Sequence, residues 1–249
     1  MPASLTGLPR ITATSYLVPL REGGSLPGIV EGDDLGTYVL KFHGAGQGPK
    51  ALVAEVIVGE LYRRLGLRVP ELKLMDLDPV IGRSEPDEEV QELLVRSGGL
   101  NLAVDFLPGA LGYDGSTGKP SDEESARILW LDAYVANIDR SWRNTNMLVW
   151  HKQLWLIDHG ATLYFHHSWT PVERFVAATY DAKDHVFRDA DAGAVDEAMA
   201  ASITADLLTE VVSLVPDEWV EPGDRSRYVE YLLARLADRS AWLPGGDDR

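Results

Sequence analysis

The sequence predicts an α+β protein, with a small antiparallel sheet and one main helix first and a mostly helical part after it. Short β-branched and apolar runs separated by glycine turns fill most of the first 108 residues. A long helical pattern begins at Pro49, and apolar stripes at helical spacing recur from Ala205 to Leu214 and from Tyr228 to Leu236. A chain of 249 residues is long enough for one large domain or for two small lobes that share a cleft.

Composition and turns place the elements of the first part. The first two strands should form a hairpin around Gly23-Gly24-Ser25, and the helix from Pro49 should end at Gly66, which favours a C-terminal stop. The acidic segment from Ser84 to Glu92 is predicted to be a solvated connection. The expected strands are 12–20, 26–30, 37–42, 69–77 and 100–106.

The second part is expected to begin after Pro108-Gly109. The stretch 111–120 contains glycine and proline and is predicted to be a linker, so the boundary falls between residues 1–108 and 109–249. Ser121 and Glu124 form a capping box for a helix that runs to about Asn137. A hairpin with strands at 147–150 and 154–157 follows it. The core of this part is predicted to include three tryptophans, Trp142, Trp150 and Trp155.

Composition excludes several classes of function. The net charge of −16 would repel nucleic-acid backbones and anionic membranes, so we expect neither as a direct partner. The chain has no cysteine, which removes thiolate catalysis and cysteine-ligated metal sites. His159, His166 and His167 do not have the spacing of a transition-metal site. Because no apolar run is long enough to span a membrane, we expect a cytoplasmic protein.

Two aspartates and an asparagine form the most informative pattern. Asp139 follows a helix, Asn144 comes five residues later, and Asp158 follows the hairpin. One carboxylate and one amide oxygen that converge on nucleotide phosphates are sufficient protein ligands for Mg²⁺, and Asn144 and Asp158 can be that pair. Asp139 could then orient or deprotonate an attacking hydroxyl. Taken singly, each of these residues is more typical of a turn or helix cap than of a ligand, and it is their joint spacing that favours the site.

Lys41 lies within an apolar strand, where an unpaired ammonium is costly to bury. It either reaches solvent from an edge or meets a carboxylate or a phosphate. Glu55, on the following helix, is the preferred partner because it shares a helical face with Leu52, Val56 and Gly59. Glu60 is the competing choice.

Asp139-Arg140-x-x-x-Asn144, followed by Ile157-Asp158-His159-Gly160, resembles the HipA-like kinases. The resemblance extends upstream through Gly23-Gly24-Ser25, Lys41 and Glu55, and covers about residues 17–164. It implies a bilobal protein kinase-like fold, with Asp139 as catalytic residue and with Asn144 and Asp158 as magnesium ligands.

ATP and Mg²⁺ are therefore the expected cofactors. The Gly23-Gly24-Ser25 backbone can present N–H groups to phosphates, since glycine carries no Cβ. Asp105, Phe106 and Leu107 form the expected hinge, whose main chain can hydrogen-bond adenine. Taken alone, the glycine pair is more typical of an ordinary turn, and the hinge stretch is equally consistent with an ordinary strand end.

Three functions remain open from the sequence. The leading one is an ATP- and Mg²⁺-dependent phosphotransferase that acts on an unidentified hydroxyl of a protein or a small molecule. A nucleotide-binding pseudokinase or an adenylyltransferase would use the same cleft. The third is a non-catalytic acidic module that binds a protein partner.

Overall fold

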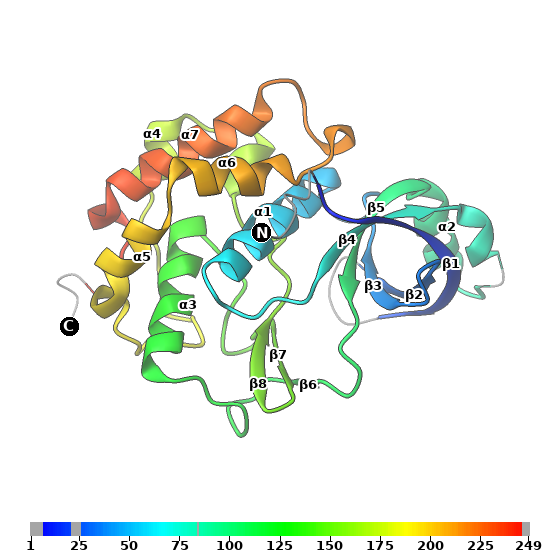
Figure 1. Ribbon diagram of the computed structural model, residues 1–249, viewed down its shortest axis with the longest axis horizontal. Coiled ribbons are helices and arrows are strands. Elements are labelled where there is room, and N and C mark those ends of the chain that lie inside the picture. The colour runs from blue at the N-terminus through cyan, green and yellow to red at the C-terminus, as the bar shows by residue number, and fades with distance from the viewer. Residues whose placement is uncertain (1–6, 21–25, 84, 246–249) are drawn as a thin grey trace, which may run out of the picture.

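The computed structural model describes residues 7–20, 26–83 and 85–245. Five strands form a small closed barrel in the order β1-β2-β3-β5-β4 at one end of the molecule (Figure 1). Adjacent strands are antiparallel except β1 and β4, whose parallel pairing closes the barrel. The prediction of an antiparallel sheet was therefore wrong for this pair. The strands are β1 (Arg10–Pro19), β2 (Gly28–Gly32), β3 (Thr37–Lys41), β4 (Leu72–Leu77) and β5 (Gly99–Asp105).

Irregular pairing in β1 explains how the barrel closes. The register of β1 against β2 shifts between Ala13 and Ser15 and again between Tyr16 and Val18. Such bulges bend a strand and increase its twist. The first residues of β1, from Arg10 to Thr12, consequently pair with β4, while the rest of the strand pairs with β2.

Alternation along β3 decides where Lys41 points. Tyr38 and Leu40 are buried in the barrel interior, so Val39 and Lys41 lie on the outer face of this strand. This outer face is not open solvent, because the side chain of Lys41 is only 15% exposed.

The acidic segment predicted to be solvated instead contributes a helix, α2 (Glu88–Arg96). Asp87 caps its first turn by accepting a hydrogen bond from the backbone N–H of Glu89. Val90, Leu93 and Leu94 recur at helical spacing and are buried with the barrel interior. The prediction was wrong because acidic residues on the exposed face obscured this short apolar stripe.

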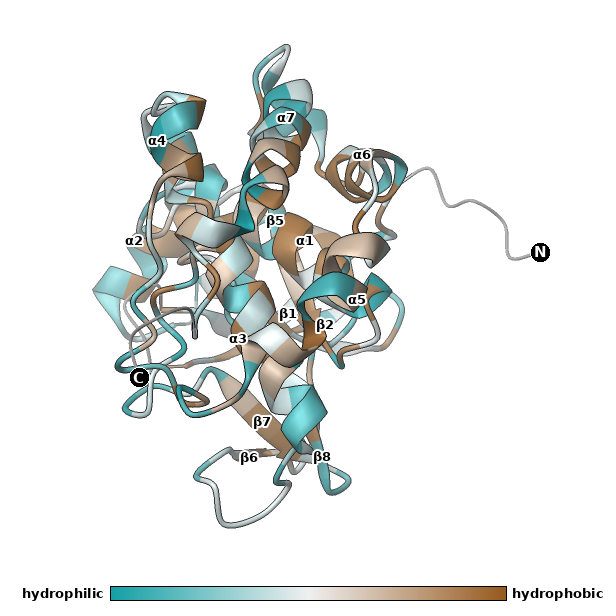
Figure 2. Ribbon diagram, turned by 90° about the vertical axis from the view of Figure 1, so that its left-hand side faces the viewer, coloured by the Kyte–Doolittle hydropathy of each residue, from teal (hydrophilic) through white to brown (hydrophobic). Residues whose placement is uncertain are grey.

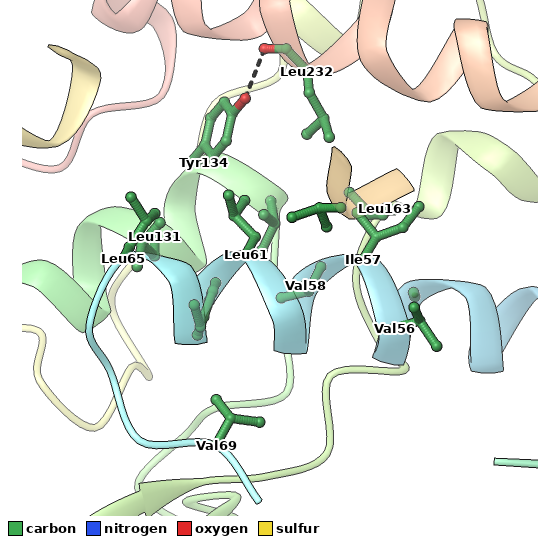
Figure 3. Packing of buried hydrophobic residues seen from close by; sticks show 14 of the residues in the cluster. Val56, Ile57, Val58, Leu61, Leu65, Val69, Leu131, Tyr134, Leu163 and Leu232 are labelled. Atoms are coloured by element: carbon green, nitrogen blue, oxygen red, sulfur yellow. Dashed lines mark hydrogen bonds between the residues drawn. The ribbon is translucent and has the colours of Figure 1, made fainter. Parts of the chain in front are cut away.

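Helix α1 (Pro49–Arg64) lies between the barrel and the helical part (Figure 1). It begins at Pro49 as predicted, and Gly66 just beyond its end has a φ of 84°, which favours glycine. Every residue from Leu52 to Tyr62 is buried, and the helix is largely hydrophobic around its circumference (Figure 2). Figure 3 shows side chains of α1, such as Ile57 and Leu61, near Tyr134 and Leu232 from the helical part.

The predicted linker also contains regular structure. Strand β6 (Leu111–Gly112) pairs with β7 (Met147–Trp150), which pairs with β8 (Gln153–Leu156) in the expected hairpin. The hairpin turn places His151 and Lys152 at positive φ. The boundary between 108 and 109 stays a prediction.

Five further α-helices lie in the described part of the remaining chain. Helix α3 begins after its predicted Ser121 cap, whose hydroxyl accepts from the backbone N–H of Glu124 at 3.1 Å. The helices are α3 (Asp122–Val135), α4 (Val172–Val176), α5 (Asp196–Ser202), α6 (Ala205–Ser213) and α7 (Asp224–Ala237). Within the described residues, no helix has the length and apolar character needed to cross a membrane.

The tryptophans predicted to be core are placed differently. Trp142 is exposed, and Trp150 and Trp155 are only half-buried. Trp130 and Trp242 are the fully buried ones, and they contact each other edge to face. A hydrophobic residue type alone did not distinguish exposed positions in a loop and a hairpin from positions in the core.

Candidate functional site

Lys41 lies at the centre of the candidate site. Its ammonium donates a hydrogen bond to Glu55 Oε1 on α1 and another to Asp158 Oδ1, at 2.8 Å, beyond the end of β8. Burial opposes the charged form of Lys41, but the two carboxylates raise its pKa above the usual value. Lys41 therefore carries its positive charge at neutral pH.

Glu55 is the carboxylate that was predicted to pair with Lys41. The same Oε1 atom also accepts a hydrogen bond from the backbone N–H of Gly160 at 2.8 Å. Glu55 consequently connects β3 to the Asp158-His159-Gly160 segment. Glu60, the competing choice, forms ion pairs with Arg63 and Arg64 on its own helix.

Asp139 lies in the loop that follows α3. Its carboxylate accepts hydrogen bonds from the side-chain amides of Asn144, at 3.2 and 3.3 Å, and of Asn146, at 2.9 Å. Asp139 lines a cavity of about 320 Å³ together with Lys41 and Asp158. The fold thus brings three of the predicted site residues from distant parts of the sequence to one cavity.

Asn146 is a second candidate amide ligand that the sequence analysis missed. It is buried, whereas Asn144 is exposed. It directly precedes β7, and its backbone carbonyl accepts from the N–H of Ile157 at 3.0 Å, which places it opposite the residue before Asp158. In an antiparallel hairpin, the residue before the first strand lies opposite the residue after the second strand. This rule applied to the predicted hairpin could have identified Asn146 from the sequence.

Asn146, just before β7, and Asp158, two residues after β8, both have a left-handed backbone conformation. Asn146 has a φ of 48° and Asp158 a φ of 58°. The charge of Lys41 lowers the pKa of the Asp158 carboxyl to about 2 against the opposing effect of burial. Asp158 is therefore an anion with one oxygen on Lys41 and its side chain about half exposed.

A second cavity, of about 300 Å³, also has Lys41 in its wall. Its wall includes the predicted hinge residues Asp105, Phe106 and Leu107, and mostly apolar side chains such as Val39 and Leu156. Lys41, Glu55 and Asp158 line both cavities. An apolar cavity that meets a charged one through a buried ammonium suits a ligand with a flat apolar end and an anionic end.

The predicted phosphate-binding residues Gly23, Gly24 and Ser25 lie outside the described residues. Pro27, which follows them, lines the apolar cavity. Another glycine-rich segment, missed from the sequence, contributes Ala45, Gly46 and Gln47 to the cavity that holds Asp139. Gly46 has a φ of 47°, and a Cβ built there would meet no atom within 4 Å, so this backbone is open to a ligand.

We also searched the rest of the described residues for a metal site or a nucleotide site. In residues 7–20, 26–83 and 85–245, no group of three or more histidine, cysteine, aspartate or glutamate side chains could hold a metal ion. A larger cavity, of about 570 Å³, lies beside the start of α3 and contains Asp122, Glu123, Asp189 and Asp191. Four carboxylates would repel phosphates, so we do not place a nucleotide there.

Comparison with known proteins identifies the family. Residues 16–239 match the sequence profile described as HipA-like kinase. The chain belongs to the HipA-like kinase family. None of the curated protein sequences matches it.

One solved structure has a similar fold at low sequence identity, and a second matches more weakly. The Helicobacter pylori proinflammatory kinase CtkA has a TM-score of 0.58 and 13% sequence identity, and the alignment covers 94% of this chain and 95% of that one. The Golgi casein kinase with Mn/ADP bound has a TM-score of 0.47 at 12% identity, over 93% of this chain and 73% of that one. Membership of the HipA-like kinase family makes this chain a kinase-type phosphotransferase.

Proposed function

We propose that this HipA-like kinase uses ATP and Mg²⁺ to transfer the γ-phosphate to a hydroxyl acceptor. The convergence of Lys41, Glu55, Asp139 and Asp158 on two connected cavities is the observation that carries the proposal. In this proposal the barrel and the helical part act as two lobes that divide near residue 108, with the nucleotide between them.

The apolar cavity would hold the adenine and ribose. The backbone N–H groups of Asp105 and Phe106 already donate to the carbonyls of Glu71 and Thr37, at 2.9 and 3.1 Å. We therefore assign the N–H of Leu107 as the donor to the adenine ring. Gly23, Gly24 and Ser25 would cover the phosphates, and Lys41 would contact them in place of its present bond to Asp158.

Asp158 and one asparagine amide fit the requirements of a magnesium site. Magnesium prefers oxygen ligands and keeps waters, so it needs few protein ligands when phosphates supply the others. The Nδ2 atoms of Asn144 and Asn146 donate to Asp139, so each can offer Oδ1 to an ion. When bound, the ion neutralises charge that develops on the transferred phosphoryl group.

Asp139 would act on the acceptor. Both asparagine amides hold its carboxylate at the cavity wall, where it can accept the proton of an attacking hydroxyl. We propose a serine or threonine of a protein, or a small-molecule hydroxyl, as acceptor. The acidic surface of a chain with net charge −16 would favour a basic protein partner.

Nucleotide binding and transfer can be tested separately. We expect the melting temperature to rise with millimolar ATP and to rise further with Mg²⁺, since a ligand that binds only the native state stabilises it. Asp139→Asn should keep ATP affinity within a few-fold and reduce γ-phosphate transfer by about 100-fold or more, because the carboxylate acts on the nucleophile.

Asp189→Asn, an exposed change in the acidic cavity, is the control and should retain both properties. Absence of Mg²⁺-dependent ATP binding, or transfer of AMP in place of phosphate, would contradict the proposal.

A further inference from the structure

Arg140 is a buried arginine directly after the candidate catalytic aspartate. Only 1% of its surface is exposed, and among the side chains described it is one of the largest that are fully buried. Burying a guanidinium is costly unless its donors are satisfied and its charge is paired. The groups that bond to Arg140 therefore indicate which role its burial serves.

Asp132 on α3 balances the charge of Arg140. Arg140 Nε donates to Asp132 Oδ2 at 2.7 Å, and the charge of Arg140 contributes to holding the pKa of the Asp132 carboxyl far below its usual value against the effect of burial. Three other donors complete the shell of this carboxylate: Tyr62 at 2.8 Å, Asn137 at 2.6 Å and His185 at 3.0 Å. Asp132 is thus held by four side chains and gives Arg140 a fixed anchor.

The remaining nitrogens of Arg140 reach the two candidate metal-ligand segments. Nη1 donates to the backbone carbonyl of Asn146 at 2.6 Å, and Nη2 lies 3.4 Å from His159 Nδ1. A guanidinium can only donate, so His159 Nδ1 accepts. Burial and the charge of Arg140 lower the pKa of His159 to about 3, which keeps this imidazole neutral.

These contacts fall at the two left-handed positions of the site. Asn146 and Asp158 both have positive φ, a conformation that most residues disfavour and that asparagine and aspartate adopt more readily. Arg140 bonds to Asn146 itself and to the residue that follows Asp158. One rigid, planar side chain therefore fixes both ligands relative to each other.

We propose that Arg140, anchored by Asp132, is a positioning residue that sets Asn146 and Asp158 at the separation a divalent cation requires. This inference rests on the proposed function, because it assigns Arg140 a role toward the metal that accompanies ATP. Removing such supporting partners of metal ligands typically lowers metal affinity by about 10- to 100-fold.

The test compares two buried arginines. Arg235 on α7 is fully buried as well, but it bonds to the backbone carbonyls of Ala133, Tyr134, Phe175 and Ala178. Arg140→Met and Arg235→Met should both lower the melting temperature. Only Arg140→Met should raise, by about 10-fold or more, the Mg²⁺ concentration that gives half of the additional stabilisation in the presence of ATP.

Further variants keep the test decisive if Arg140→Met does not fold. Arg140→Lys retains the charge, but its single ammonium cannot span Asp132, Asn146 and His159, and Asp132→Asn weakens the anchor. Both should shift the Mg²⁺ dependence in the same direction while stabilisation by ATP alone stays within a few-fold.

The possible failures are distinguishable. Wild-type Mg²⁺ dependence in the folded Arg140 variants, or an equal shift in Arg235→Met, would overturn the positioning role. A wild-type protein that shows no Mg²⁺-dependent stabilisation would instead overturn the proposed function.

Discussion

At the residue scale, the site depends on one ammonium shared between two carboxylates. Lys41 is held by Glu55 from a buried helix and by Asp158 from a half-exposed position. Replacing the ammonium leaves the buried Glu55 carboxylate without its charged partner, which is destabilising. Glu55 keeps its hydrogen bond from the Gly160 N–H, and burial raises its pKa and so favours the neutral form, so we expect a loss of stability and not unfolding.

We therefore expect Lys41→Met to reduce phosphoryl transfer strongly while the protein remains folded. Methionine fills a similar volume without the charge. Glu55→Gln should give a milder loss, because it retains a hydrogen-bond acceptor for Lys41 and Gly160. Initial rates and circular dichroism measure the two effects. Unchanged transfer in Lys41→Met would remove this residue from the mechanism.

The choice between the two asparagines is also a residue-scale question. We expect Asn146→Gly to raise the Mg²⁺ concentration for half-maximal ATP-dependent stabilisation by about 10-fold or more, and Asn144→Ala to change it by less than about three-fold. Glycine is used at position 146 because its φ of 48° would strain alanine. The opposite ranking would restore Asn144 as the ligand.

At the element scale, local sequence patterns predicted the elements whose start, end or pairing depends on neighbouring residues. The strands, the Pro49 start of α1, the Ser121 cap and the β7–β8 hairpin each follow from neighbouring residues. Lys41, Glu55, Asp139 and Asp158 could be brought together because they lie on or beside these elements. The parallel pairing of β1 with β4 could not be predicted from local patterns. It joins residues more than 60 positions apart in the sequence, and it accompanies bulges in β1 that the sequence does not reveal.

The missed residues have a related explanation. Asn146 differs from Asn144 in burial and in its place against Ile157, neither of which is visible from spacing after Asp139. The glycine segment around Gly46 gains meaning only from the cavity it lines. Helix α2 was hidden because its polar face dominates its composition.

Helix α2 gives the element-scale prediction. Leu94 is buried against the barrel interior, whereas the adjacent Val95 is exposed. Leu94→Ala should lower the free energy of unfolding by about 2–5 kcal/mol, and Val95→Ala should change it by less than about 0.5 kcal/mol. Urea unfolding measures both. Equal, small effects would mean that this segment is not part of the barrel core.

At the scale of the whole molecule, net charge and buried histidines determine how stability changes with pH. The chain carries a net charge of −16, so it repels itself at neutral pH. Most carboxylates protonate below about pH 5, and relief of this repulsion is therefore small between pH 7.5 and 5.5. Histidines that are buried in the neutral form dominate that range.

His159 and His166 are both fully buried, and burial is the main cause that lowers the pKa of each to about 3. In the unfolded chain each takes up a proton near pH 6.5, so the unfolded state binds more protons between about pH 6.5 and 3. Stability is therefore expected to fall with decreasing pH in this window, by roughly 1.4 kcal/mol per pH unit for each histidine.

Replacing one of these histidines measures its contribution to the change of stability with pH. His166 Nδ1 bonds to the Tyr228 hydroxyl at 2.9 Å, and an asparagine amide can keep this bond without titrating. We expect His166→Asn to remove about half of the stability lost between pH 7.5 and 5.5, as measured by urea unfolding at each pH. His151→Asn, in the exposed β7–β8 turn at a φ of 50° that asparagine tolerates, is the matched control and should leave the slope unchanged. A slope in His166→Asn equal to that of the wild type would show that His166 is not held neutral by the fold.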